Sequence, residues 1–196
     1  ESYRKLVPAS NVKLLTTGTA MNELGDDFQF ETTLAYSGTL EEGTLKGDLY
    51  IVGGGDPTLA SKDSIAVTAE SLFSQWRAML SKAGIRKIEG NIVGDGRYFD
   101  GEKELSSWLY EDIGTYYGTG ADGLCFYRNI QDFNVSPGPS VGSPIKVAPN
   151  YPKVPWMQFT YNCSTGIKGS GDKLYLYTTD VAPVAELRGT FAVDRK

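Results

Sequence analysis

The segment from Pro8 to Gly25 reads Pro-Ala-Ser-Asn-Val-Lys-Leu-Leu-Thr-Thr-Gly-Thr-Ala-Met-Asn-Glu-Leu-Gly, and it predicts a helix. Pro8 suits the first helical position, and Gly25 suits the left-handed residue that ends a helix. No charge lies between Lys13 and Glu23, and the apolar residues spread around the helix instead of forming one stripe. We therefore expect a helix that is buried on every side.

Two residues near the start of this helix are candidates for catalysis. Ser10 and Lys13 are three residues apart, so a helix places their side chains on one face, within reach of each other. Burial of an amine disfavours its charged form, which makes this hydroxyl and amine a candidate nucleophile and base. Because Ser10 is expected in the first turn, its amide has no acceptor one turn earlier and could donate to an oxyanion.

The Ser-x-x-Lys spacing alone is not specific. It also occurs at Ser2/Lys5, Ser143/Lys146 and Ser170/Lys173. Only Ser10 is followed by an apolar helix. For the bare pattern, the alternative is that Ser10 is an ordinary helix-start residue and Lys13 a solvated charge.

Longer runs connect the helix to a known family. Residues 8–16 (Pro-Ala-Ser-Asn-Val-Lys-Leu-Leu-Thr), 53–59 (Gly-Gly-Gly-Asp-Pro-Thr-Leu) and 90–95 (Gly-Asn-Ile-Val-Gly-Asp) are followed by shorter runs at 116–118, 136–138 and 187–190. In this order, they resemble the D-alanyl-D-alanine carboxypeptidase/endopeptidase family, the class C low-molecular-mass penicillin-binding proteins. Ser-x-x-Lys is a known motif of penicillin-binding proteins, together with Ser-Asp-Asn and Lys-Thr-Gly.

The resemblance implies a reaction and a compartment. Ser10 would attack the penultimate D-alanine of a peptidoglycan stem peptide and Lys13 would take its proton, while β-lactam antibiotics would trap the acyl-enzyme. Asp95 would help to hold the amino end of the stem-peptide side chain, although a strand-end turn is an equal alternative for it. The resemblance also implies an exported protein of the periplasm or cell envelope, and no cofactor is expected.

Two motifs of the family are missing, because the chain has neither Ser-x-Asn nor Lys-Thr-Gly. In the family, the accessory domains are inserted between the first and second motifs. We therefore expect a fragment, inactive by itself, that holds the first motif and the insertions. The alternative is a non-catalytic cell-envelope binding or scaffold module.

Composition narrows the choice of chemistry. The 196 residues carry a net charge of −5 without a dense basic cluster, which argues against nucleic acid as a partner. No histidine is present, which excludes a Ser-His-Asp triad and any zinc site in which this chain supplies a histidine. No apolar run is long enough for a membrane span. Cys125 and Cys163 could form one disulfide, but we expect two thiols.

The pattern along the chain predicts a mixed α+β and α/β fold in three parts. Residues 1–27 would be a piece of a transpeptidase-like domain, 28–123 an α/β unit and 124–196 a β-rich unit. In the second part we expect strands at 28–37 and 44–52 that pair around a turn at 38–43, a helix at 64–83, a strand at 85–93 and a long loop at 101–123. In the third we expect strands at 130–136, 145–148, 156–163, 173–178 and 185–193.

Two further motifs have structural alternatives. The run Gly53-Gly54-Gly55 follows a strand, but no Gly-Lys-Ser/Thr comes after it, so we expect a tight backbone reversal and no nucleotide site. The run Tyr127-Arg128-Asn129 resembles the Tyr-x-Asn element of some serine β-lactamases. Because it lies where the β-rich part begins, we expect an ordinary turn or strand there.

Overall fold

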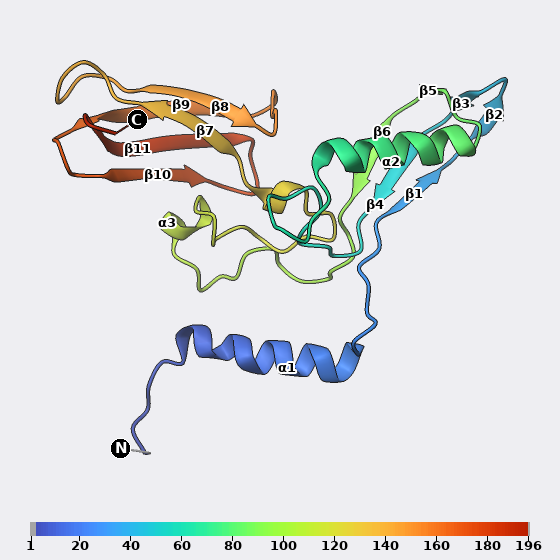
Figure 1. The fold of residues 1–196 in the computed structure, drawn as a ribbon, viewed down its shortest axis with the longest axis horizontal. Coiled ribbons are helices and arrows are strands. Elements are labelled where there is room, and N and C mark those ends of the chain that lie inside the picture. The colour runs from blue at the N-terminus through green and yellow to red at the C-terminus, as the bar shows by residue number, and fades with distance from the viewer. Residues whose placement is uncertain (1–2, 196) are drawn as a thin grey trace. The chain divides into compact units, whose positions relative to one another are not determined.

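A computed structural model describes residues 3–195, and these form two compact units. The first unit ends at Glu31 and the second begins at Thr32. Figure 1 shows the elements of both, and no described helix has the length and hydropathy to span a membrane.

The first unit holds the predicted helix. A 3-10 turn, η1 (Ala9–Asn11), leads into α1 (Val12–Leu24), and Gly25 follows with a φ of 79°. The predicted end is therefore confirmed, because glycine adopts this backbone conformation without the strain that a Cβ causes. The expected burial is not found: α1 is exposed along its whole length, since residues 3–31 contain no other element that could cover it.

The second unit begins with two short sheets that form a βαβ arrangement. The strands are β1 (Thr33–Tyr36), β2 (Thr39–Glu41), β3 (Thr44–Lys46), β4 (Leu49–Val52), β5 (Lys87–Glu89) and β6 (Ile92–Asp95). β1 pairs with β4 and β2 with β3 in antiparallel fashion, whereas β3–β5 and β4–β6 are parallel pairs around the helix α2 (Ala69–Lys82). The predicted strand pairing and βαβ unit are confirmed, but the strand predicted at 28–37 begins only at Thr33. The turn predicted at 38–43 is wrong in part, because β2 lies inside it.

A shared break divides these strands into two sheets. Gly47 donates its amide to Glu89, and Asp48 accepts two hydrogen bonds from Asn91, at 2.7 and 3.0 Å. A Cβ on Gly90 would lie 2.1 Å from the Gly47 carbonyl oxygen. The interruption between β3 and β4 thus lies opposite the one between β5 and β6, where the backbones approach too closely for a side chain.

The helix α2 begins later than predicted and ends as predicted. Thr68 caps it, accepting a hydrogen bond from the Ser71 amide at 3.2 Å, so residues 64–67 lie outside the helix. Threonine at this position satisfies one of the free amides of the first turn. Gly84 follows the helix with a φ of 83°, in agreement with the predicted stop.

Two layers of strands form the C-terminal part of the second unit (Figure 1). One sheet has the order β10 (Asp172–Thr178), β11 (Val184–Ala192), β9 (Gln158–Gly166), and the other pairs β7 (Asp132–Ser136) with β8 (Lys146–Tyr151). Phe133 of β7 meets Phe159 of β9 edge to face at 5.2 Å. All five strands overlap the predicted ranges. A four-residue helix, α3 (Tyr110–Ile113), interrupts the loop predicted at 101–123.

The core of the second unit crosses residue 123. Its centre is formed by Leu59, Ala60 and Leu72, and Leu124 and Phe126 pack against it. The α/β and β-rich parts therefore share apolar contacts. The division of the chain at 27 and 123 into three domains stays a prediction.

Candidate active site

The turn before α1 brings the predicted nucleophile and base together. Ser10 lies in η1 and Lys13 in the first turn of α1, and the Lys13 Nζ donates a hydrogen bond to the Ser10 Oγ at 3.1 Å. The predicted proximity of the two side chains is confirmed. Both groups are exposed within the residues that the structure describes.

The backbone around Ser10 leaves an amide ahead of the helix. The first hydrogen bond within the turn runs from the Asn11 amide to the Pro8 carbonyl at 3.0 Å. The Ser10 amide therefore lies one residue before the first donor of the turn. Amides at this end of a helix have no acceptor within the helix, so they can donate to an anion. Ala9 precedes it with a φ of 44°, a left-handed conformation that is unfavourable for a residue with a Cβ.

The third predicted site residue, Asp95, lies in the second unit at the end of β6. Arg97 donates to its carboxylate from Nε at 2.9 Å, from Nη2 at 2.7 Å and from the backbone amide at 3.1 Å. These hydrogen bonds favour the charged form and lower the pKa of Asp95 to about 2. The carboxylate therefore lies in a strand-end turn and stays charged at neutral pH, and a role of Asp95 in substrate binding stays a prediction.

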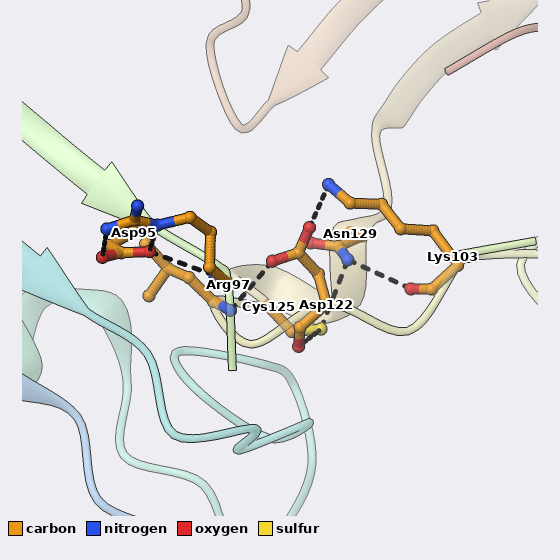
Figure 2. A network of polar contacts seen from close by, with 8 residues as sticks. Asp95, Arg97, Lys103, Asp122, Cys125 and Asn129 are labelled. Carbon is orange, nitrogen blue, oxygen red and sulfur yellow. Dashed lines mark hydrogen bonds and ion pairs between the residues drawn. The ribbon is translucent and has the colours of Figure 1, made fainter. Parts of the chain in front are cut away.

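A second ion pair lies close to the first (Figure 2). Asp122 pairs with Lys103 and accepts a hydrogen bond from the Leu124 amide at 3.1 Å. Asn129 completes the network, since its Nδ2 donates to the Gly120 carbonyl at 3.4 Å and to the Cys125 Sγ at 3.3 Å. The sequence-based interpretation gave no role to Lys103 or Asp122 and did not connect them with Cys125 and Asn129, because the loop that brings them together lacks periodicity.

The Tyr127–Asn129 turn has an unusual backbone. Tyr127, Arg128 and Asn129 all have positive φ values, of 53°, 59° and 53°. Left-handed conformations cost about 1–2 kcal/mol for each residue with a Cβ, so neighbouring contacts must hold this turn. The contacts converge on Asp132. The Tyr127 hydroxyl donates to its carboxylate at 2.9 Å, and Lys62 pairs with the same carboxylate at 2.6 Å. Tyr127 is a buried structural residue here.

The glycine run after β4 uses its amides within the protein. Gly53 donates to the Asp95 carbonyl at 2.9 Å, and Gly55 donates to the Gly123 carbonyl at 2.8 Å. A phosphate loop instead directs such amides to the ligand. The run therefore has the geometry of a backbone reversal that ties β4 to β6 and to the segment around residue 123.

The two cysteines are unpaired. The Cys125 Sγ donates to the Asp122 carbonyl at 3.2 Å, and Cys163 lies half-buried in β9, where desolvation raises the pKa of its thiol. The expectation of two thiols is confirmed. Among residues 3–195, no cluster of three or more cysteine, aspartate or glutamate side chains could hold a metal ion.

Comparison with known proteins gives consistent matches. The model of the D-Ala-D-Ala carboxypeptidase 3 (S13) family matches residues 1–182. Over 149 residues the chain is 33% identical to the D-alanyl-D-alanine carboxypeptidase of Actinomadura sp. (strain R39), covering 73% of this chain and 26% of the relative. Over 138 residues it is 32% identical to D-alanyl-D-alanine carboxypeptidase DacB of Haemophilus influenzae, covering 68% of this chain and 27% of the relative.

Solved structures agree with the fold. The crystal structure of penicillin binding protein 4 (dacB) from Haemophilus influenzae matches 97% of this chain and 40% of its own, with a TM-score of 0.73 and 24% identity. A second structure of that protein, complexed with a novel β-lactam, matches with a TM-score of 0.63 and 23% identity. The predicted mixed fold is confirmed. The chain spans about a quarter of the length of the two curated relatives.

Proposed function

Because the chain belongs to the D-Ala-D-Ala carboxypeptidase 3 (S13) family, we propose that it carries the nucleophile and base of a serine D-alanyl-D-alanine carboxypeptidase/endopeptidase. The observation that carries this proposal is the 3.1 Å hydrogen bond between Lys13 and Ser10. Ser10 also has the other feature that acyl transfer requires, an amide at the start of a helix that can face a developing oxyanion.

The proposed reaction is an acyl transfer to Ser10. The Oγ attacks the carbonyl carbon of the penultimate D-alanine, and its proton passes to the Lys13 amine. The tetrahedral intermediate collapses, the C–N bond breaks, and the departing nitrogen takes up the proton. Water then hydrolyses the ester by the reverse order of proton transfers. A β-lactam would acylate Ser10 in the same way but leave slowly, which is how it would inhibit.

Lys13 needs a further element before it can act as a base. An ammonium has three donors and no acceptor, so it must lose a proton first. Removing water from around an amine favours this loss. We propose that a covering domain closes over α1 and brings both the desolvation and the missing second oxyanion donor. The apolar residues around α1 support this proposal, because each of them is left exposed within residues 3–31.

Asp95 is the proposed substrate-binding residue. A carboxylate that stays charged at neutral pH is a suitable partner for the amino group of a stem-peptide side chain. Such a ligand would have to share the oxygens that Arg97 now occupies. The substrate also sets the compartment that we propose, the periplasm or cell envelope, since peptidoglycan lies outside the cytoplasmic membrane.

Labelling with a fluorescent penicillin tests the function. The experiment uses the protein translated from the complete reading frame, with Ser10→Ala as the test variant and Ser170→Ala as the matched control, because Ser170 also precedes a lysine by three residues. We expect label on the wild type and on Ser170→Ala and none on Ser10→Ala. Label that persists on Ser10→Ala would contradict the assignment of the nucleophile.

A further inference from the structure

One face of the sheet β10-β11-β9 carries a regular set of polar and aromatic side chains. Residues that are opposite each other in register point to the same face of a sheet. Two adjacent rows across the three strands are Tyr175–Arg188–Asn162 and Tyr177–Glu186–Thr160. The other face carries Phe159 and the buried Leu187, and Phe159 contacts Phe133 of the second layer. The two rows therefore lie on the outer face of the sandwich, and we call this set the tyrosine face.

The polar groups of the tyrosine face are held in fixed positions. The Arg188 Nη2 donates to Glu186 Oε2 at 2.7 Å, and Asn162 Nδ2 donates to Glu186 Oε1 at 3.5 Å. The Arg188 guanidinium also lies 4.7 Å from the centre of the Tyr177 ring. Stacking and hydrogen bonding together fix its plane. Arginine has five N–H donors, so this arrangement leaves several of them available to a ligand.

Two exposed rings flank this fixed centre. Tyr175 is 52% exposed and lies opposite Arg188 in register, and Tyr110 from α3 is 61% exposed. Tyr110 lies 5.5 Å from Tyr177, ring centre to ring centre, so α3 extends the tyrosine face past the edge strand β10. Exposed tyrosines offer an apolar ring with a polar end to a ligand that is itself amphipathic.

The chemistry of the tyrosine face matches a sugar chain. A pyranose ring has a C–H surface that packs on an aromatic ring and an edge of hydroxyl or acetamido groups that pair with planar side chains. The two outer strands of this sheet lie about 10 Å apart, two spacings of about 4.8 Å, which is enough for an extended chain to cross the face. Arg188 is already balanced by Glu186, which disfavours a polyanion, and the rings are separated by polar groups, which disfavours an apolar helix.

We propose that the tyrosine face binds the glycan strand of peptidoglycan, a chain of N-acetylated amino sugars. The choice of this polymer rests on the proposed function, because an enzyme that acts on stem peptides meets the glycan to which they are attached. The face lies in the second unit, so it would bind the polymer independently of the chemistry at Ser10.

The test measures binding of the 196-residue chain to glycan strands from which an amidase has removed the stem peptides. We expect saturable binding that weakens about tenfold in Tyr175→Ala and in Arg188→Gln, since each variant removes a ring or a planar donor from the contact. Tyr175→Phe keeps the ring and should bind within about twofold of the wild type. Tyr36→Ala is the matched control, because Tyr36 is also a half-exposed strand tyrosine but lies in a different sheet.

Each other outcome counts against the proposal. Absence of binding to the stripped strands would overturn it, and so would an equal loss in Tyr36→Ala. Binding that requires intact stem peptides would show a peptide site instead. The result does not depend on the proposed function, because Ser10→Ala should bind the glycan like the wild type whether or not Ser10 reacts with penicillin.

Discussion

Arg97 holds both carboxylate oxygens of Asp95 from only two residues away. Its Nε lies 2.9 Å from Oδ1 and its Nη2 lies 2.7 Å from Oδ2, and its backbone amide adds a third hydrogen bond at 3.1 Å. A bidentate contact of this kind fixes the geometry of a carboxylate as well as its charge. The end of β6 therefore presents a carboxylate whose position and negative charge are both fixed.

This contact predicts an unusual titration of Asp95. We expect its pKa to be about 2 in the wild type and to return toward the ordinary value of about 3.8 in Arg97→Gln. Carbon-13 NMR of the side-chain carboxyl measures both. Arg86→Gln is the control, because Arg86 donates to the Glu42 backbone carbonyl and to no carboxylate that the structure shows. A wild-type pKa near 3.8 would contradict the geometry.

The lowered pKa of Asp95 also predicts how the stability of the fold changes with pH. The folded pKa lies below the unfolded one, so the contact stabilises the protein above about pH 4 and is lost as the pH falls toward 2. Denaturant unfolding between pH 5 and 2 should therefore show a shallower acid-side decline of the free energy of unfolding in Arg97→Gln than in the wild type. A parallel decline in both proteins would show that Asp95 is not linked to folding.

Gly53 should tolerate no side chain. A Cβ there would lie 2.1 Å from the Gly123 carbonyl oxygen, which also accepts the Gly55 amide. We expect Gly53→Ala to lower the free energy of unfolding by about 1–3 kcal/mol, because the two backbone segments must separate. Gly101→Ala is the matched control, since a Cβ added there would meet no other atom within 4 Å. Equal stability of the two variants, measured by urea unfolding, would contradict the close approach.

Local signals explain what could be predicted from the sequence. Pro8 and Gly25 bracket η1 and α1, and Gly84 ends α2, because proline and glycine act through the backbone of their own neighbourhood. The Ser10–Lys13 contact was predictable for the same reason, since three residues along a helix set the distance. The parallel pairing around α2 followed from the order of elements.

Strand pairing and long-range contacts explain the rest. The strand β2 lies where Gly38 and Gly43 indicate only a turn, because pairing with β3 overrides the local preference. The left-handed Tyr127–Asn129 turn depends on Lys62 and Asp132, which are 70 residues apart. By contrast, Arg97 could have been found from the sequence, since an Asp-x-Arg spacing at a strand end allows the pair that the structure shows.

A count of reactive thiols should distinguish two free cysteines from a disulfide. We expect two reactive thiols per chain when the protein is unfolded without reductant, because Cys125 and Cys163 are both unpaired. In the folded protein, alkylation of Cys163 should be slow at pH 8 and accelerate at higher pH, since burial raises the pKa of its thiol and the thiolate is the reactive form. The variant Cys163→Ser identifies the part of the alkylation that comes from Cys163. A count of zero would show that the two are oxidised.

The 196-residue chain alone should fail to react with a fluorescent penicillin, although it carries Ser10. Acylation requires a nucleophile, a base and two preorganised donors at the carbonyl oxygen, and this chain offers the Ser10 amide as one donor. Loss of a single oxyanion donor costs about 10²–10³ in rate. The Lys13 amine is also exposed to water here, without the desolvation that the proposed covering domain would bring.

The decisive comparison sets the chain against the product of its complete reading frame. Identical concentrations and exposure times should give stoichiometric label on the longer protein and none on residues 1–196, because both deficits act on one transition state. Ser10→Ala in the longer protein must remove the label, which ties the difference to this nucleophile. Efficient labelling of the 196-residue chain would show that Ser10 and Lys13 need no covering domain, and the proposed role of the exposed α1 surface would then be wrong.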